Sequence, residues 1–248
     1  MGDTIQSVER AAAILRLLAS GPRLLGVAEL ARALGLPKGT LHGILRTLVK
    51  VGFVEQDAAT GKYRLGATLL HLGSSYLDVN ELRTRSLNWA DALAGRSRES
   101  AWIGTLHEGH VLVIHHVFRP DDSMQTLQVG TYLPAHASAL GKVLLAHDPY
   151  GEAAPPLAPH TGRTLVDPGA LERELDQVRA RGWAAEMEEL VEGEVALAAP
   201  IKDPRGIVVG AIGIRGAVER LADGDAPRME FVSYVRDAAR AITRSLAH

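Results

Sequence analysis

Basic and polar residues between positions 38 and 64 have the chemistry to contact a nucleic acid. Lysine and arginine neutralise backbone phosphates, and arginine and threonine also form hydrogen bonds with base edges. The candidate residues are Lys38, Gly39, Thr40, His42, Gly43, Arg46, Thr47, Lys50, Lys62 and Arg64. We expect this set to bind double-stranded DNA.

The charge of the chain is unevenly divided. Residues 1–66 contain 9 Lys+Arg and 5 Asp+Glu, whereas residues 67–248 contain 18 and 24. A near-neutral total therefore hides a basic amino-terminal segment beside an acidic remainder. Because a basic patch supplies the sequence-independent part of DNA affinity, this division favours DNA binding over a merely solvated group of charges.

Two predicted helices and a hairpin would position the basic residues as a winged helix-turn-helix. Apolar residues at helical spacing predict a helix over Val27–Leu34, which Gly35 ends. Pro37 is expected at the first position of the next helix, where its missing N–H costs nothing. Residues 53–57 and 62–65 then predict a hairpin.

The helix after Pro37 separates its residues by face. The arc expected to face the core carries Leu41, Ile44, Leu45 and Leu48, and the opposite arc carries Gly39, Gly43, Arg46 and Lys50. Each glycine in a helix interior costs about 0.5–1 kcal/mol relative to alanine. Close approach to a phosphate or base edge would explain two of them on an exposed face.

The hairpin alternation predicts one buried face. Phe53 and Glu55 are expected on the same side as Tyr63 and Leu65. The intervening positions of the second strand carry Lys62 and Arg64, which would then point outward from the wing.

The remaining chain predicts an α+β domain that follows a connecting helix. Helices are predicted at residues 67–76, with an interruption at 73–75, and at 79–94, 139–146, 168–181 and 227–246. Strands are predicted as a hairpin within 101–118, as a third strand at 124–129, and as a hairpin of 195–202 with 207–215. Antiparallel strands with helices to one side make an α+β sensor domain.

Longer motifs resemble the IclR family of transcriptional regulators. In the amino-terminal part they are QSVERAAAIL at 6–15, LARALGLPK at 30–38, TLH at 40–42, GFVEQD at 52–57 and GKYRLG at 61–66. In the remainder they are HASALGK at 136–142, RGW at 181–183, EE at 188–189, AAPI at 198–201 and GIVVGAIG at 206–213. The resemblance therefore spans nearly the whole chain.

The resemblance implies an architecture and partners. It predicts a winged helix-turn-helix DNA-binding domain at residues 1–66, a linker helix at 67–80, and an effector-binding and oligomerisation domain of GAF or profilin type at 81–248. The implied partners are operator DNA, a small-molecule effector, and further copies of the chain in a homodimer or a dimer of dimers.

Residues 39–48, 75–79 and 115–123 are most similar to the members of this family that control glycerol operons. This similarity implies a repressor with glycerol 3-phosphate or glycerol as its inducer. The commoner family pattern has serine where Gly39 stands and arginine where Gly43 stands. Direct base contact is therefore expected from Arg46 instead.

The resemblance also implies a set of effector contacts: His136, Ser138, Ala139, Leu140, Glu186, Ala196, Gly213 and Arg215. A cysteine of the family falls on Ala196, and two strand serines fall on Gly213 and Arg215. A helix amino terminus after Ser138 and the charge of Arg215 would suit a phosphate, and Glu186 would accept hydrogen bonds from hydroxyl groups. These features favour a small phosphorylated polyol.

Two other interpretations of this pocket remain open. Arg215 could be a surface residue that pairs with Glu219 or another nearby acid, and Glu186 could be a solvated charge in an acidic loop. In either case the pocket would lose a polar group on which the phosphorylated ligand depends.

Enzymatic motifs are incomplete. Gly141 and Lys142 lack the other residues of a phosphate-binding loop, and Ser138 lacks the glycines of a nucleophile elbow. Neighbouring His115 and His116 point to opposite faces of a strand, which disfavours a histidine metal cluster. We expect no enzymatic activity, no cofactor and no metal.

Two alternative functions are retained. One is an IclR-type regulator of another catabolic pathway, responsive to a small organic or aromatic acid, and the other is an enzyme with a DNA-binding head. The sequence has no cysteine and no run of the roughly 18 apolar residues that a membrane helix needs. We expect a cytoplasmic protein without a membrane partner.

Overall fold

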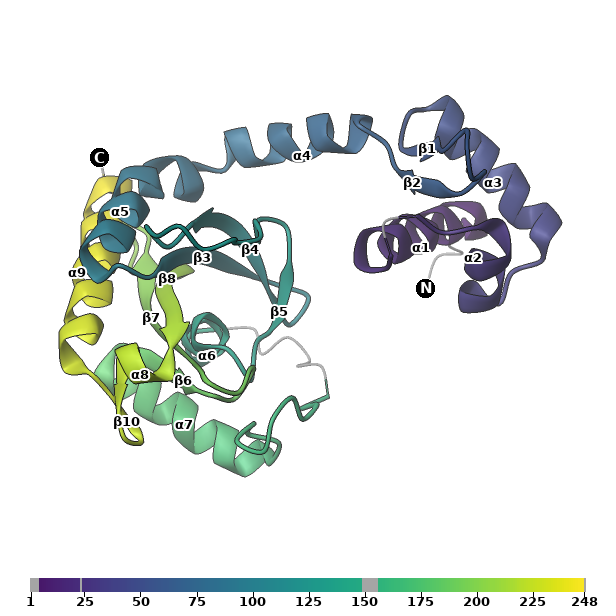
Figure 1. The fold of residues 1–248 in the computed structure, drawn as a ribbon. Helices are drawn as coiled ribbons and strands as arrows, with labels where there is room; N and C mark the ends of the chain where they lie inside the picture. Colours follow the sequence, from purple (N-terminus) through teal and green to yellow (C-terminus); the bar gives the residue numbers. More distant parts are fainter. Residues whose placement is uncertain (1–4, 23, 149–155, 248) are drawn as a thin grey trace. The chain divides into compact units, whose positions relative to one another are not determined.

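The computed structural model describes residues 5–22, 24–148 and 156–247, and the chain divides into two compact units, Met1–Val79 and Asn80–His248 (Figure 1). The first unit contains a helix-turn-helix and a hairpin, and the second contains the large sheet.

In the first unit, three helices and a hairpin pack around a small apolar core, and a fourth helix follows them in the chain. The core elements are α1 (Gln6–Ser20), α2 (Val27–Leu34), α3 (Lys38–Lys50), β1 (Val54–Gln56) and β2 (Tyr63–Leu65), and the helix that follows is α4 (Thr68–Val79). Ile14, Leu30, Leu41 and Leu45 are fully buried in this core. Backbone hydrogen bonds of 3.0 and 2.8 Å between Leu25 and Tyr63 attach the hairpin to the segment that precedes α2.

The helix boundaries follow local signals closely. Gly35 ends α2 in the left-handed conformation, with φ of 63°, as the sequence predicts. Leu41, Leu45 and Leu48 of α3 are buried and Ile44 is half-buried, which confirms the apolar arc. Pro37 is the N-cap of α3 and the helix begins at Lys38, so the expected position of Pro37 is wrong by one residue.

The face assigned to the first strand of the wing is also wrong by one residue. Val54 pairs with Leu65 and Gln56 pairs with Tyr63, so Val54 shares the face of Tyr63. Val54 and Tyr63 are buried, whereas Leu65 is exposed. Because side chains alternate along a strand, a shift of one residue in register exchanges the two faces of β1.

Helix α4 continues through the expected interruption at residues 73–75. The hydroxyl groups of Ser74 and Ser75 donate hydrogen bonds to the carbonyls of Leu70 and His71, one turn earlier in the same helix. These side chains therefore fold back on the helix and leave its backbone ladder in place.

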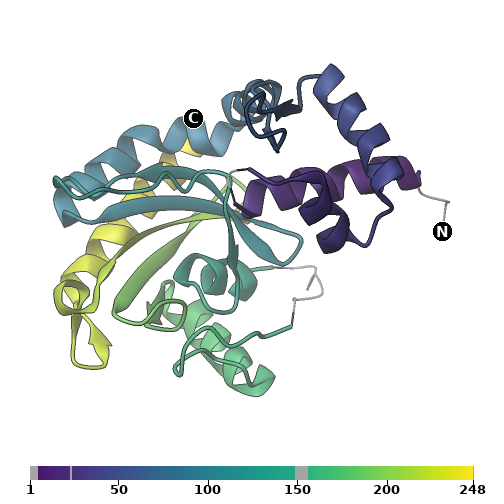
Figure 2. The same ribbon diagram turned by 45° about the vertical axis from the view of Figure 1, so that its right-hand side comes forward.

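The second unit is a six-stranded antiparallel sheet covered by helices on both faces (Figures 1 and 2). The strand order is β5-β4-β3-β8-β7-β6. The strands are β3 (Ser100–His107), β4 (His110–Val117), β5 (Tyr132–Pro134), β6 (Ala184–Met187), β7 (Glu194–Lys202) and β8 (Val208–Ala217). The α5 (Glu81–Ser97) and α9 (Met229–Leu246) helices lie together on one face, and α6 (Ala139–Ala146), with α7 (Pro168–Arg181) packed on it, lies on the other.

The α+β class is confirmed, but helices cover both faces of the sheet rather than one. Strand β8 explains why: Ile212 and Ile214 are buried toward one face, and Ala211 and Gly213 are buried toward the other. A strand with two buried faces needs helices on both sides. Gly141 lets α6 lie close to the segment that precedes it, because a Cβ at Gly141 would come within 2.3 Å of the Ala135 backbone.

The strand expected at residues 124–129 is absent, and a shorter strand follows at Tyr132–Pro134. Side-chain hydrogen bonds hold this segment instead of a strand ladder. The Gln125 carboxamide exchanges hydrogen bonds of 2.8 Å with the backbone of Arg119, and the Gln128 N–H donates to Nδ1 of His116 at 3.3 Å.

Several other boundaries differ from the expected ones. Helix α5 begins after the N-cap Asn80, whose side chain accepts a hydrogen bond from the N–H of Arg83, and it continues to Ser97. Helix α9 begins at Met229, because Pro227 belongs to a small hairpin of β9 (Ala222–Asp223) and β10 (Ala226–Pro227) that follows α8 (Val218–Leu221). Of the helices described, none combines the length and hydropathy needed to cross a membrane.

Candidate functional site

The exposed side of α3 borders a groove in the first unit. Helix α3 lines it with Gly39, His42, Gly43 and Arg46, and also with Val49, and the hairpin lines it with Gln56 and Tyr63. The first four are among the sequence-predicted residues. Lys38, Thr40, Thr47 and Lys50 lie elsewhere on the helix. The groove residues of the hairpin were not anticipated, because they depend on the register of the wing.

Gly39 and Gly43 are not required by the packing of the protein itself. A Cβ added at either position would meet no heavy atom within 4 Å. The two glycines nevertheless weaken the helix by about 0.5–1 kcal/mol each relative to alanine. They leave a strip of bare backbone beside the groove, and such a strip permits close approach of a partner.

The cations of α3 and of the hairpin differ in whether a nearby carboxylate neutralises them. Lys62 lies 3.6 Å from a carboxylate oxygen of Glu29, and Arg64 lies 3.0 Å from Glu55. Arg46 is exposed and makes no ion pair among the residues that the structure describes. Its guanidinium is therefore the one in the α3 groove that is available to an anionic or base-edge partner.

The second unit contains a small cavity between α6 and the sheet. Seven of the eight predicted effector residues line it, namely Ser138, Ala139, Leu140, Glu186, Ala196, Gly213 and Arg215. The predicted residue His136 is buried but does not line the cavity, because its ring Nε2 lies 3.0 Å from the carbonyl of Ala158. Trp102, Leu133, Leu197 and Ile214 complete the lining and were not anticipated.

Three of the cavity residues lie in one row across the sheet. Glu186 of β6 pairs with Ala196 of β7, and Ala196 pairs with Arg215 of β8. Directly opposed residues point to the same face, so the acid and the base both lie on the α6 side. The small side chain of Ala196 leaves space between them.

The carboxylate of Glu186 is held at one oxygen and free at the other. Its Oε1 accepts hydrogen bonds from the N–H groups of Glu189 at 2.7 Å and Leu190 at 3.1 Å. Its Oε2 is buried without a hydrogen-bond partner in the described structure. Burial raises the pKa of Glu186 to about 7, against the opposing effects of these hydrogen bonds and of Arg215. The solvated-loop interpretation of Glu186 is therefore wrong.

A buried ion pair lies behind Glu186. The Nζ of Lys142, in α6, donates hydrogen bonds to Oε1 of Glu189 and, at 3.1 Å, to the carbonyl of Ala185. Lys142 is 1% exposed and Glu189 7% exposed. Since the backbone N–H of Glu189 also donates to Glu186, this pair fixes the loop that orients the cavity carboxylate.

Arg215 is mostly buried and joins the cavity to an open groove. Its Nε donates to a carboxylate oxygen of Glu194, which is the acid that pairs with it in place of Glu219, and its guanidinium lies 5.9 Å from the ring centroid of Trp102. Trp102, Leu133 and Arg215 line both the cavity and a groove of about 660 Å³ outside it. These three side chains therefore form the wall between the two spaces.

Helix α6 points its amino terminus at the cavity. Ser138 is the N-cap: its hydroxyl oxygen accepts a hydrogen bond from the N–H of Gly141 at 3.3 Å and donates to the carbonyl of Pro134 at 2.8 Å. Ala139 and Leu140 follow on the cavity wall, where the first N–H groups of the helix and its dipole favour an anion.

His115 and His116 do not form one site, because adjacent residues of β4 point to opposite faces of the strand. His116 is buried with its ring 4.8 Å from that of Trp102, whereas the pKa of His115, on the other face of β4, is lowered by burial and by Arg83 of α5. In the part of the chain that the structure describes, no three metal-ligating side chains gather in one place.

Both units match known family descriptions. Residues 7–58 match the IclR helix-turn-helix domain, and residues 74–244 match the family described as bacterial transcriptional regulator IclR C-terminal. Together these matches cover most of the chain.

Individual relatives span nearly the same length. The glycerol operon regulatory protein of Streptomyces coelicolor is 55% identical over 249 residues, which cover 99% of this chain and 98% of the relative. The crystal structure of an IclR transcriptional regulator from Alicyclobacillus acidocaldarius superposes with a TM-score of 0.83 at 25% identity, covering 99% of this chain and all of that one. An IclR homolog from Microbacterium hydrocarbonoxydans, complexed with 4-hydroxybenzoate, superposes with a TM-score of 0.81 at 26% identity, covering 97% and 99% of the two chains.

Proposed function

This chain belongs to the IclR family of bacterial transcriptional regulators, and we propose that it represses a glycerol catabolic operon and is released by glycerol 3-phosphate or glycerol. Regulators of this family bind operator DNA and small-molecule effectors and act as oligomers. The Streptomyces coelicolor relative supports the choice of operon. We propose no catalytic step for the protein, and we expect it to act in the cytoplasm, where it would meet an operator.

The row formed by Glu186, Ala196 and Arg215 is the observation that carries the proposed ligand. A phosphate would bind the guanidinium of Arg215 and the first N–H groups of α6, which both face the cavity. A hydroxyl group of the ligand would donate to Oε2 of Glu186, which lacks a partner in the described structure. A polyol with one phosphate at its end satisfies both requirements.

Entry of this ligand requires a local rearrangement. The cavity volume is about 20 Å³, which is room for about one water molecule. The wall of Trp102, Leu133 and Arg215 therefore has to open toward the outer groove. We infer that Arg215 exchanges the carboxylate of Glu194 for the phosphate, so that ligand binding replaces one ion pair by another.

The first unit supplies the operator contacts in this proposal. Arg46 reads a base edge from the α3 groove, and Lys62 and Arg64 contact the phosphate backbone from the wing. The neighbouring contacts come from Lys38, Gly39, Thr40, His42, Gly43, Thr47 and Lys50. Two copies of the chain would bind half-sites one helical turn apart, about 34 Å, or at a multiple of that spacing.

A second candidate is a regulator that responds to an aromatic acid. The structural relative in complex with 4-hydroxybenzoate favours it, and Trp102 in the cavity wall could stack on an aromatic ring. The carboxylate of such a ligand would also bind Arg215. Oε2 of Glu186 would gain a hydrogen-bond partner from such a ligand only if the aromatic ring carried a hydroxyl group.

Operator release distinguishes the two candidates. The DNA probe is the region upstream of a neighbouring glycerol kinase or glycerol uptake gene, and fluorescence anisotropy measures its binding to the full chain. We expect glycerol 3-phosphate or glycerol to lower the affinity for this probe, with 4-hydroxybenzoate inactive. Release by 4-hydroxybenzoate alone would favour the second candidate, and failure to bind the probe would remove the glycerol operon.

A further inference from the structure

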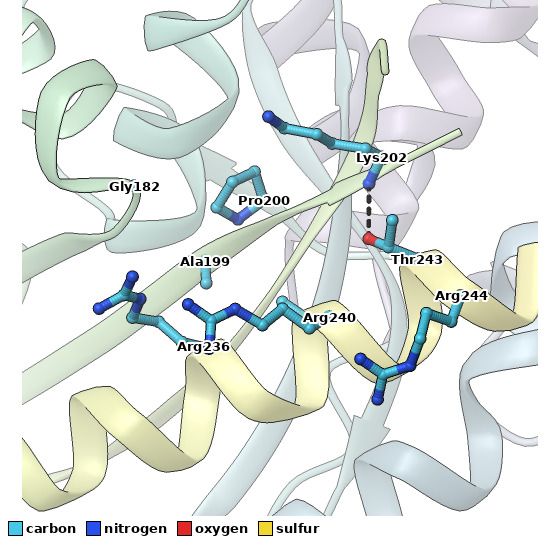
Figure 3. Close-up of a pocket in the computed structure, with 9 residues that line it drawn as sticks. Gly182, Ala199, Pro200, Lys202, Arg236, Arg240, Thr243 and Arg244 are labelled. Atoms are coloured by element: carbon cyan, nitrogen blue, oxygen red, sulfur yellow. Dashed lines mark hydrogen bonds between the residues drawn. The ribbon is translucent and has the colours of Figure 1, made fainter. Parts of the chain in front are cut away.

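A groove on the α9 side of the second unit carries positive charge that the proposed function does not use. It lies between α9 and β7 and has a volume of about 360 Å³ (Figure 3). Four of its lining residues are cationic, namely Lys202, Arg236, Arg240 and Arg244, and none of its lining residues is acidic. The effector cavity lies on the opposite face of the sheet, under α6.

The four cations come from two elements that are fastened to each other. Arg236, Arg240 and Arg244 recur every four residues, so they follow one side of α9 at about 6 Å intervals along its axis. Figure 3 shows these three in a row along the helix, with Lys202 on the adjacent strand. The backbone N–H of Lys202 donates to Oγ1 of Thr243 at 3.0 Å, which holds the strand against the helix at this point.

The charge in this groove is poorly neutralised. Among the described residues, Lys202, Arg236 and Arg244 make no ion pair, and Arg240 reaches only Asp237, at 3.8 Å. Asp237 is shared with Arg96, which lies 3.5 Å away. Residues 67–248 carry 18 Lys+Arg and 24 Asp+Glu, so the groove is a concentration of positive charge within an acidic part of the chain. A bound anion would relieve the mutual repulsion of these cations.

The shape of the groove indicates a compact ligand rather than an added strand. Its floor includes the small, buried side chains of Ala199 and Ala239. Strand β6 pairs with β7 only over Val195–Ala198, which leaves the following residues of β7 at an open edge. Pro200 lies on that edge without an N–H group, and a proline there blocks the addition of another strand.

We propose that this groove is a second ligand site, which binds a soluble ligand with two or more phosphate groups, such as a nucleoside triphosphate. Guanidinium groups bind phosphate oxygens in pairs, and successive arginines along α9 offer a separate fork to each phosphate. A monoanion would leave most of the charge in the groove unpaired. The site is independent of the glycerol proposal, because it shares no residue with the effector cavity.

Calorimetric titration of the full chain tests this site, with adenosine triphosphate and inorganic tripolyphosphate as the probes at about 0.15 M salt. We expect one saturable site per chain for each probe. The variant R240A/R244A should weaken both affinities by about tenfold or more, since it removes two charge-assisted contacts. The variant R240K/R244K keeps the charge but loses the forked geometry, so its affinity should fall between that of the unsubstituted chain and that of R240A/R244A.

A matched control removes the same charge elsewhere on this unit. Arg85 and Arg173 lie outside the groove and pair with Glu81 and Asp167 at 3.5 and 3.9 Å, so R85A/R173A should change the affinities by less than about twofold. Absence of saturable binding, or an equal loss in this control, would overturn the site. It would also be overturned if Arg46→Ala abolished triphosphate binding, which would place the probe on the DNA surface. If R240A/R244A lost nonspecific DNA binding but kept the affinity for both triphosphate probes, the groove would be reassigned to DNA.

Discussion

Glu186 and Arg215 occupy one register row of the sheet, with Ala196 of the intervening strand between them. Their side chains face the same cavity, and each already has a protein partner: backbone N–H groups for the acid and Glu194 for the base. The pair therefore offers a ligand one unsatisfied carboxylate oxygen and one cation whose present partner can be exchanged.

The raised pKa of Glu186 predicts a pH-dependent stability. The folded chain retains the proton up to a pKa of about 7, whereas the unfolded chain releases it near 4.5. Stability should therefore fall as the pH rises from 4.5 to 7, by an amount on the order of 3 kcal/mol. The variant Glu186→Gln should not show this decrease in stability with rising pH.

Urea unfolding at several pH values measures the effect through tryptophan fluorescence, because all three tryptophans belong to the second unit. Glu192→Gln, at an exposed position, is the control and should behave as the unsubstituted chain does. Parallel pH profiles for the unsubstituted chain and Glu186→Gln would show that Glu186 is ionised well below pH 7.

The buried pair of Lys142 and Glu189 predicts an asymmetric response to substitution. Lys142→Met leaves the Glu189 carboxylate buried without its cation and should lower the unfolding free energy by about 3–5 kcal/mol. Replacing both residues by methionine should recover most of that loss, because no uncompensated charge remains. A double variant less stable than the single one would contradict this account of the pair.

Register decides which parts of this site could be predicted from the sequence. The boundaries of α2, α6 and α7 follow from local signals, such as Gly35 after α2 and Pro168 at the start of α7. The acid that pairs with Arg215 could not be predicted, because Glu194 is its diagonal neighbour on β7 only in the observed register.

Long-range contacts account for the other omissions. Trp102 precedes Arg215 by more than a hundred residues, and no local pattern indicates that both line one cavity. The sequence likewise shows Lys142 only as a charged residue in an apolar helix. Its partner Glu189 is distant in sequence and contacts it only in the folded structure. The predicted face of β1 is wrong because the strands of the wing are only three residues long, so their alternation fixes the register poorly.

The open position of Gly43 predicts opposite effects on stability and on DNA binding. Gly43→Ala adds a methyl group that meets no protein atom within 4 Å, so it should stabilise the first unit by about 0.5–1 kcal/mol. If DNA approaches the bare backbone of α3, the same methyl group should lower operator affinity. Gly95→Ala, in α5, adds an equally unobstructed methyl group and should leave operator binding unchanged. Unaltered operator binding by Gly43→Ala would mean that DNA does not approach this strip closely.

Arg46 and Lys62 should contribute differently to operator binding. Arg46→Ala should cost about 1–3 kcal/mol for the operator and relax the base preference at one position. Lys62→Ala should weaken operator and unrelated DNA about equally and reduce the salt slope by about one. Filter binding at several salt concentrations measures both quantities. An equal loss of specific and nonspecific binding in Arg46→Ala would show that its contact is to a phosphate.

Calorimetric titration with glycerol 3-phosphate tests the central claim most directly, because it measures the effector cavity without the operator. We predict saturable binding to the unsubstituted chain, a loss of about tenfold or more in Arg215→Ala, and tighter binding in Glu194→Gln, where the guanidinium has no carboxylate to exchange. The R240A/R244A variant should bind as the unsubstituted chain does. No binding heat, or an affinity unchanged by Arg215→Ala, would contradict the assignment of this cavity to a phosphorylated polyol.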